Sequence, residues 1–249
     1  LNKGISNIPE PGLDELIRDS VSKGLLSGTS NFEIVNTCDV VLVTVGTPLS
    51  DKYDADLTAL KDVFSELSSN CKDGQIIMIK STVTPGVTRK LYKEYLSDKD
   101  ISVAFSPERL AEGNAISQLK ELPIVVGGVN EKSTKDCSEF WEKTLGCKVV
   151  EVSSSETAEL VKLSENAFRD INIAFANEIS LVSEKLGIDP QLISQLCCLG
   201  GALPQGAPHR DDCWEPDVRV WRIQRPREVL ERALRARLWH VFRGDGNPR

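Results

Sequence analysis

Lys162, Asn166 and Arg169 have residue types and spacings that could do chemistry. Intervals of four and seven residues place them on one face of a helix, which we expect over residues 155–180. An amine, an amide and a guanidinium make a poor core face, but together they could hold a polar, anionic substrate. The alternative is a solvated polar face from which Lys and Arg reach into water. This helix alone favours neither interpretation.

The same helix has predictable ends and a predictable apolar side. Ser153-x-x-Glu156 is the pattern of a capping box at its start, and Gly187 is a plausible stop. We expect the opposite side of the helix to be buried through its apolar residues, which are Val161, Phe168, Ile171, Phe175, Ile179 and Val182.

Upstream, short apolar runs alternate with amphipathic stretches. The predicted strands are 39–45, 75–80, 102–105, 123–126 and 148–152, and the predicted helices are 13–27, 54–69, 86–96 and 131–144. Runs of β-branched residues without alternation indicate strands that are buried on both faces. The order predicts an α/β fold with a parallel, doubly wound, Rossmann-like sheet. Ligands of such sheets bind at the carboxyl ends of the strands.

Polar or small residues directly follow three of these strands. Gly46-Thr47-Pro48 follows the first, Ser81-Thr82 the second, and Glu108-Arg109 lies just beyond the third. Each segment alone is more simply read as a turn. Three at successive strand ends favour a site for a phosphate-bearing ligand, so we predict that Thr47, Thr82 and Glu108 lie together.

Composition narrows the classes of protein. The net charge of −7 argues against general nucleic-acid binding, and no apolar run is long enough to cross a membrane. Seven cysteines at irregular spacings are typical of reduced cytosolic thiols, and we expect neither disulfides nor a metal site.

The composition changes abruptly near residue 196. Residues 1–196 contain 16 Lys and 4 Arg against 30 acidic residues, whereas residues 197–249 contain no Lys and 10 Arg against 7 acidic residues. We expect residues 197–249 to be foreign to the fold and poorly ordered, as after a reading-frame shift or a mis-joined gene. The alternative is a genuine basic tail recruited for binding.

Several phrases together resemble the nucleotide-sugar 6-dehydrogenases, the UDP-glucose/GDP-mannose dehydrogenase family. They are L-N-K-G-I-S-N-I-P-E-P-G-L-D-E-L at 1–16, C-D-V-V-L-V-T-V-G-T-P at 38–48, K-S-T-V-T-P-G-V-T at 80–88, S-P-E-R-L-A-E-G-N-A at 106–115 and the helix at 155–180. The resemblance covers residues 1 to about 196. The N-A-F-R-D-I-N-I-A-F-A-N-E run at 166–178 is most similar to the UDP-N-acetylmannosamine branch.

The resemblance implies NAD-dependent oxidation of a sugar C6 hydroxyl to the uronate, through an aldehyde and an enzyme thioester, for polysaccharide biosynthesis. By motif, Lys162 and Asn166 would stabilise oxyanion charge, Thr82 would hold the catalytic water, and Glu108 would act as a general base. Cofactor contacts would come from Thr47, Pro48, Ser81, Thr82 and Glu112, and substrate contacts from Glu108, Arg109, Lys162, Asn166 and Arg169. The family also implies a UDP-sugar substrate, a homodimer formed through the central helix, and a cytoplasmic location.

The sequence departs from the family pattern in two places. The glycine-rich phosphate loop expected before residue 1 is missing, and no cysteine has the spacing of the nucleophile, so Cys197, Cys198 and Cys213 are not predicted to be catalytic. We therefore expect an incomplete NAD-binding domain over 1–152, the start of a helical central domain over 153–196, and the foreign tail. The expected function is that of a UDP-N-acetylhexosamine dehydrogenase whose fragment is inactive alone. A UDP-glucose 6-dehydrogenase and a non-catalytic nucleotide-binding remnant are the alternatives.

Overall fold

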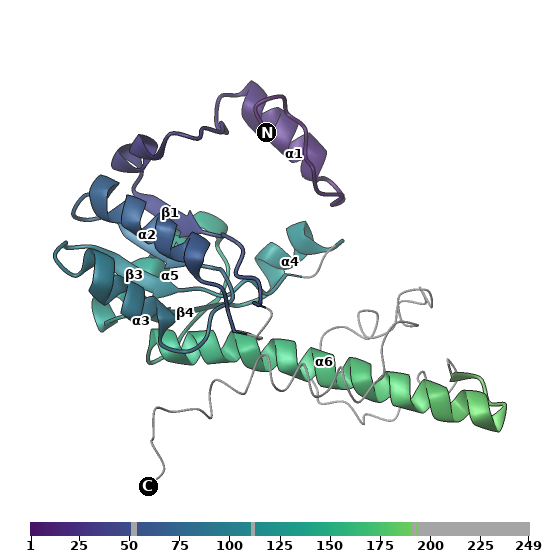
Figure 1. Ribbon diagram of the computed structural model, residues 1–249. Coiled ribbons are helices and arrows are strands. Elements are labelled where there is room, and N and C mark those ends of the chain that lie inside the picture. The colour runs from purple at the N-terminus through teal and green to yellow at the C-terminus, as the bar shows by residue number, and fades with distance from the viewer. Residues whose placement is uncertain (51–53, 111–112, 191–192, 194–249) are drawn as a thin grey trace, which may run out of the picture. The chain divides into compact units, whose positions relative to one another are not determined.

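A computed structural model describes residues 1–50, 54–110, 113–190 and 193 of the chain. The chain divides into two units after Lys162, and each is considered by itself. The first unit contains a five-stranded sheet with the order β1-β2-β3-β4-β5 (Figure 1). Its strands are β1 (Val40–Val43), β2 (Ile76–Ile79), β3 (Ser102–Phe105), β4 (Ile124–Gly128) and β5 (Val149–Glu151).

The five predicted strands are all present, and the Rossmann-like α/β class is confirmed, but the sheet is not parallel throughout. β1, β2 and β3 are parallel, with Val40 opposite Ile76 and Ile76 opposite Ser102. β4 runs antiparallel to β3, with Phe105 opposite Gly127, and β5 is parallel to β4. A parallel pair needs a crossover that returns the chain across the sheet. Here β4 instead starts beyond the carboxyl end of β3 and runs back, so that its last two residues pair with Phe105 and Ala104.

The helices follow the predicted pattern with two additions. They are α1 (Leu13–Ser22), α2 (Thr58–Asn70), α3 (Val87–Leu91) with its π-helical continuation η2 (Tyr92–Leu96), α5 (Glu131–Leu145) and α6 (Ser155–Leu186). The 3-10 helix η1 (Phe32–Thr37) and the short α4 (Ala115–Glu121) were not predicted. None of the helices in the described part of the chain has the length and apolar character that crossing a membrane needs.

Apolar side chains cover both faces of the sheet, because alternate strand residues point to opposite sides. On one face Ile77 and Ile79 join the larger core, which includes Phe64 of α2 and Leu91 of α3. On the other face Met78 joins a smaller core with Cys137, Trp141 and neighbouring residues of α5. Figure 1 shows the corresponding layers, with the sheet between α2 and α5. This arrangement explains why the strand sequences are apolar without alternation.

The start of α6 lies very close to β4. A Cβ atom on Gly127 would come within 2.2 Å of the Ser154 carbonyl oxygen, so no side chain fits there. Ser154, rather than Ser153, caps the helix, because its Oγ accepts a hydrogen bond from the Thr157 amide at 3.2 Å. The predicted capping box is therefore wrong, since the Glu156 carboxylate turns to Arg89 instead.

The far end of α6 stops as predicted. Gly187 has a φ of 67°, and the Ile188 amide donates to the Ser183 carbonyl at 2.9 Å, the bond of a Schellman motif. The expected burial of the apolar side is only partly found. Val161 packs against the larger core, but Phe168, Ile171, Phe175 and Val182 are 39–61% exposed.

Candidate active site

Hydroxyl groups join the loops that follow β1 and β2. Thr47 Oγ1 donates to the Thr82 carbonyl at 2.6 Å, and Ser81 Oγ donates to the Val45 carbonyl at 2.6 Å. Between them, a Cβ atom added to Gly46 would meet nothing within 4 Å, so the backbone faces open space there. These two hydrogen bonds hold the loops side by side at the carboxyl end of the strands. The backbone at Gly46 is open, so a ligand can approach it closely.

Lys80, at the end of β2, is a site residue that the sequence analysis did not single out. Its ammonium lies 3.5 Å from Glu108 Oε2 and 3.4 Å from the Ser106 carbonyl oxygen, and 5.2 Å from the centroid of the Trp141 ring. Its side chain is only 15% exposed. Burial lowers the pKa of Lys80, and the charge of Glu108 opposes that shift. The sequence signal that could have identified Lys80 is its position as a charged residue at the end of an otherwise apolar strand.

Glu108 is at the centre of the cluster. Its Oε1 accepts hydrogen bonds from the amides of Arg109 at 2.7 Å and Leu110 at 2.8 Å. Its backbone carbonyl accepts a hydrogen bond from Lys162 Nζ, although the two residues are 54 positions apart. With a side chain that is 44% exposed, the carboxylate remains open to solvent and to a ligand. The fold therefore brings Lys80, Glu108 and Lys162 together at the carboxyl edge of the sheet.

The other predicted residues have different positions. Arg109 donates from Nη1 to the Pro123 carbonyl at 2.8 Å, next to the start of β4, and Pro48 is exposed in the loop after β1. Asn166 and Arg169 belong to the second unit, where they follow Lys162 along α6. Glu112 lies outside the described residues. The roles assigned to all of these residues remain predictions.

Two of the described cysteines have thiols that are unreactive at neutral pH. Cys71 and Cys137 are buried, and burial raises the pKa of the first thiol to about 11 and of the second to about 12. Since the thiolate is the reactive form, neither is a nucleophile at neutral pH. Cys197, Cys198 and Cys213 lie outside the described residues.

An α/β sheet covered on both faces, with polar loops at the carboxyl ends of its first strands, is typical of the doubly wound α/β class, whose members bind ligands at that edge. Residues 1–145 match the NAD binding domain of the UDP-glucose/GDP-mannose dehydrogenase family, and residues 156–209 match the central domain of that family. The chain belongs to this family of NAD-dependent oxidoreductases. The second match continues past residue 196, where the composition changes.

Among curated relatives, the UDP-N-acetyl-D-mannosamine dehydrogenase of Methanocaldococcus jannaschii is 36% identical over 183 residues, which are 72% of this chain and 42% of that protein. The NDP-N-acetyl-D-galactosaminuronic acid dehydrogenase of Ralstonia nicotianae is 33% identical, over 76% of this chain and 47% of that protein. The chain therefore spans less than half the length of these relatives.

Solved structures of nucleotide-sugar dehydrogenases have a similar fold. A UDP-N-acetylmannosamine dehydrogenase from Pyrococcus horikoshii aligns with a TM-score of 0.77 and 26% identity, covering 94% of this chain and 59% of that one. A GDP-mannose dehydrogenase from Pseudomonas aeruginosa, solved as a ternary complex, aligns with a TM-score of 0.73 and 28% identity, covering 81% of this chain and 49% of that one.

Proposed function

We propose that this chain is part of an NAD-dependent 6-dehydrogenase that oxidises a UDP-N-acetylhexosamine, UDP-N-acetylmannosamine in particular, to the uronate. The observation that carries the proposal is the meeting of Lys80, Glu108 and Lys162 beside the joined loops of Thr47 and Thr82. Relatives named for N-acetylmannosamine and N-acetylgalactosaminuronic acid support an N-acetylated sugar.

The residues present fit a dinucleotide at the loops after β1 and β2. Gly46 allows close approach of the backbone, and Thr47, Pro48, Ser81 and Thr82 would line the bound group. NAD, when bound, supplies the acceptor for hydride from the sugar C6. By motif, Glu112 would be a further contact to the cofactor.

In the first oxidation, the Lys162 ammonium would stabilise the oxygen at C6 as it loses its proton and becomes negative. A preorganised cation at a site partly shielded from water is effective in this role. Asn166 would add a hydrogen bond to the same oxygen, and Arg109 and Arg169 would hold the anionic part of the substrate. Lys80, whose ammonium lies 3.5 Å from Glu108 Oε2, would hold that carboxylate in position to act as a general base.

The second oxidation requires a thiol, and no cysteine of the chain has the family spacing. We therefore propose that the chain alone binds ligands without completing turnover. In the whole protein we propose a homodimer formed through α6, in the cytoplasm.

The test is calorimetric titration of the chain with NAD⁺, UDP-N-acetylmannosamine and UDP-glucose, together with an NADH absorbance assay. We expect NAD⁺ to bind, the N-acetylated sugar nucleotide to bind about tenfold more tightly than UDP-glucose, and no sustained NADH formation, because the aldehyde cannot be carried on to the uronate. A preference for UDP-glucose would favour the UDP-glucose 6-dehydrogenase alternative. No binding of NAD⁺ would refute the proposal for this chain, and binding without sugar selectivity would favour a nucleotide-binding remnant.

A further inference from the structure

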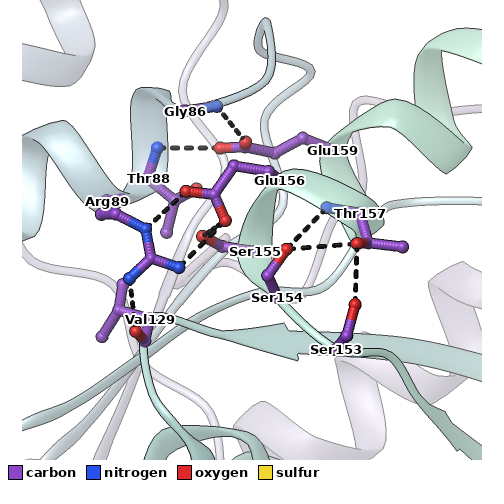
Figure 2. Close-up of polar contacts among 10 residues, drawn as sticks. All are labelled: Gly86, Thr88, Arg89, Val129, Ser153, Ser154, Ser155, Glu156, Thr157 and Glu159. Atoms are coloured by element: carbon purple, nitrogen blue, oxygen red, sulfur yellow. Dashed lines mark hydrogen bonds and ion pairs between the residues drawn. The ribbon is translucent and has the colours of Figure 1, made fainter.

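The carboxylate of Glu159 binds the N-terminus of α3, and it has no role in the proposed oxidation. Glu159 is 0% exposed, and its two carboxylate oxygens accept hydrogen bonds from the amides of Gly86 at 2.6 Å and Thr88 at 2.8 Å. Figure 2 shows the carboxylate turned toward these two amides. The first amides of a helix lack partners within the helix, so an anion there is well placed.

A second contact joins the same two segments. The guanidinium of Arg89 binds Glu156, with Nε 2.5 Å from Oε1 and Nη2 3.0 Å from Oε2, and its Nη1 donates to the Val129 carbonyl at 2.6 Å (Figure 2). This pair is about one-third exposed, whereas Glu159 is fully buried. Arg89 therefore links the first turn of α6 to α3 and to the end of β4.

The positions of these contacts along the chain connect the two parts of the candidate site. Gly86 closes the loop that contains Thr82, and Glu159 precedes Lys162 by one turn of α6. Gly86 has a φ of 96°, which suits glycine, and it leads directly into α3. The segment of α6 that presents Lys162 to Glu108 thus also holds the end of the Thr82 loop.

A simple packing role does not explain why a carboxylate stands at this position. Desolvation raises the pKa of Glu159, which shows that burial of the charge is unfavourable, and the amides of Thr88 and Gly86 offset part of that cost. An apolar side chain would avoid the burial of charge, but it would leave the two amides without an acceptor. What distinguishes Glu159 is that its carboxylate accepts hydrogen bonds from two backbone amides, those of Gly86 and Thr88, and so holds both in place.

We propose that Glu159 is a positioning residue, which sets the position of the Thr82 loop relative to Lys162 by holding the amides of Gly86 and Thr88. The role rests on the proposed dehydrogenase site. It does not require Glu159 to touch the substrate or the cofactor.

The test compares the wild-type chain with Glu159→Gln and Glu159→Asp. Glutamine keeps the size of the side chain but replaces one acceptor with a donor, so it can satisfy only one of the two amides. Aspartate keeps the charge but is one methylene shorter. Glu178→Gln, an exposed position on the same helix, is the matched control for loss of a negative charge.

Amide exchange measured by NMR should become about tenfold faster in Glu159→Gln at whichever amide, Gly86 or Thr88, loses its acceptor, less so in Glu159→Asp, and should not change in Glu178→Gln. Exchange at Ile77 and Val103, in the sheet core, should stay the same. Reductive methylation of Lys162, followed by mass spectrometry with exposed Lys185 as the internal reference, should become about threefold faster as Lys162 loses its fixed position.

The proposal is overturned if exchange at Gly86 and Thr88 is unchanged, or if exchange rises equally in the core, because that would be a general loss of stability. It is also overturned if the two amides are released while the labelling of Lys162 stays the same. These readouts need no cofactor, so they remain decisive if NAD⁺ does not bind, a result that would refute the proposed function separately.

Discussion

The first two turns of α6, from Ser155 to Lys162, differ from the remainder of the helix in what their side chains contact. In the first part Ser155, Ala158 and Glu159 are fully buried, and the amides of Gly86 and Thr88 and the guanidinium of Arg89 hold the helix through its two carboxylates. In the later part Phe175 is 61% exposed and Val182 is 51% exposed. One helix thus combines a polar attachment at its start with exposed apolar side chains in its later turns.

The difference shows how one long helix can do two tasks. Hydrogen bonds have defined directions, so the polar contacts of the first turns determine which loop lies beside Lys162. Apolar contact is not directional and scales with area, so the later turns can serve association without affecting the geometry at the sheet edge.

The largest expected effect comes from removing the acceptor in the first part. Glu159→Met keeps a side chain of similar length but leaves the Gly86 and Thr88 amides buried without a partner. Each such donor costs about 1–3 kcal/mol, so with two donors the free energy of unfolding should fall by roughly 2–6 kcal/mol. Urea denaturation measures it. Glu178→Met is the control, and an equal loss there would contradict the comparison.

The Arg89–Glu156 pair should make the stability of the first part depend on pH. Arg89 lowers the pKa of Glu156 from its ordinary 4.5 to about 2, so the folded state favours the ionised carboxylate. The stability from this pair is complete above about pH 4.5 and is lost as the pH falls toward 2.

Arg89→Gln should therefore reduce the free energy of unfolding at pH 6 by about 1–2 kcal/mol, a value discounted for the partial exposure of the pair. The difference between the variant and the wild-type chain should shrink as the pH is lowered from 4.5 toward 2. Glu159 has a raised pKa and contributes in the opposite direction, but it is present in both proteins. A difference that does not vary with pH would contradict the assignment.

A smaller effect is expected where the Thr82 loop is tied to the loop after β1. Thr47→Val removes the hydrogen bond from Oγ1 to the Thr82 carbonyl but keeps the shape of the side chain. Thermal or urea unfolding should show a loss of about 0.5–1.5 kcal/mol. Thr37→Val, which removes an exposed local bond within η1, should cost less. If the two substitutions cost the same, the Thr47 bond has no special role at the site.

The smallest effect on stability is expected in the later part of α6. Phe175→Ser should change the free energy of unfolding by less than about 0.5 kcal/mol, because the side chain is already exposed. In the proposed homodimer the same change should shift sedimentation toward the monomer. Leu25→Ser removes an exposed apolar side chain from the first unit and should not do so. A wild-type chain that sediments as a monomer would refute association of this chain through α6.

Many elements could be predicted because their signals are local. The run Q-I-I-M-I-K predicted β2, since a strand buried on both faces needs consecutive apolar residues. Gly187 predicted the end of α6, since a left-handed residue at that point favours glycine. The placement of Thr47 and Thr82 side by side followed from the rule that parallel strands end at the same edge.

The tertiary structure decided the features that depend on residues far apart in the chain. The direction of β4 depends on where the connection after β3 runs, and no local pattern records this. Ser153-x-x-Glu156 looked like a cap, but Glu156 has a stronger partner in Arg89, a cation 67 residues away. Lys80 and Glu159 were missed for the same reason. Lys80 ends an apolar strand and Glu159 is one of several charged residues on its helix, and neither stands out until folding supplies Glu108 or the amides of Gly86 and Thr88. The sequence by itself determined the elements and their chemistry, and long-range packing decided which charges meet.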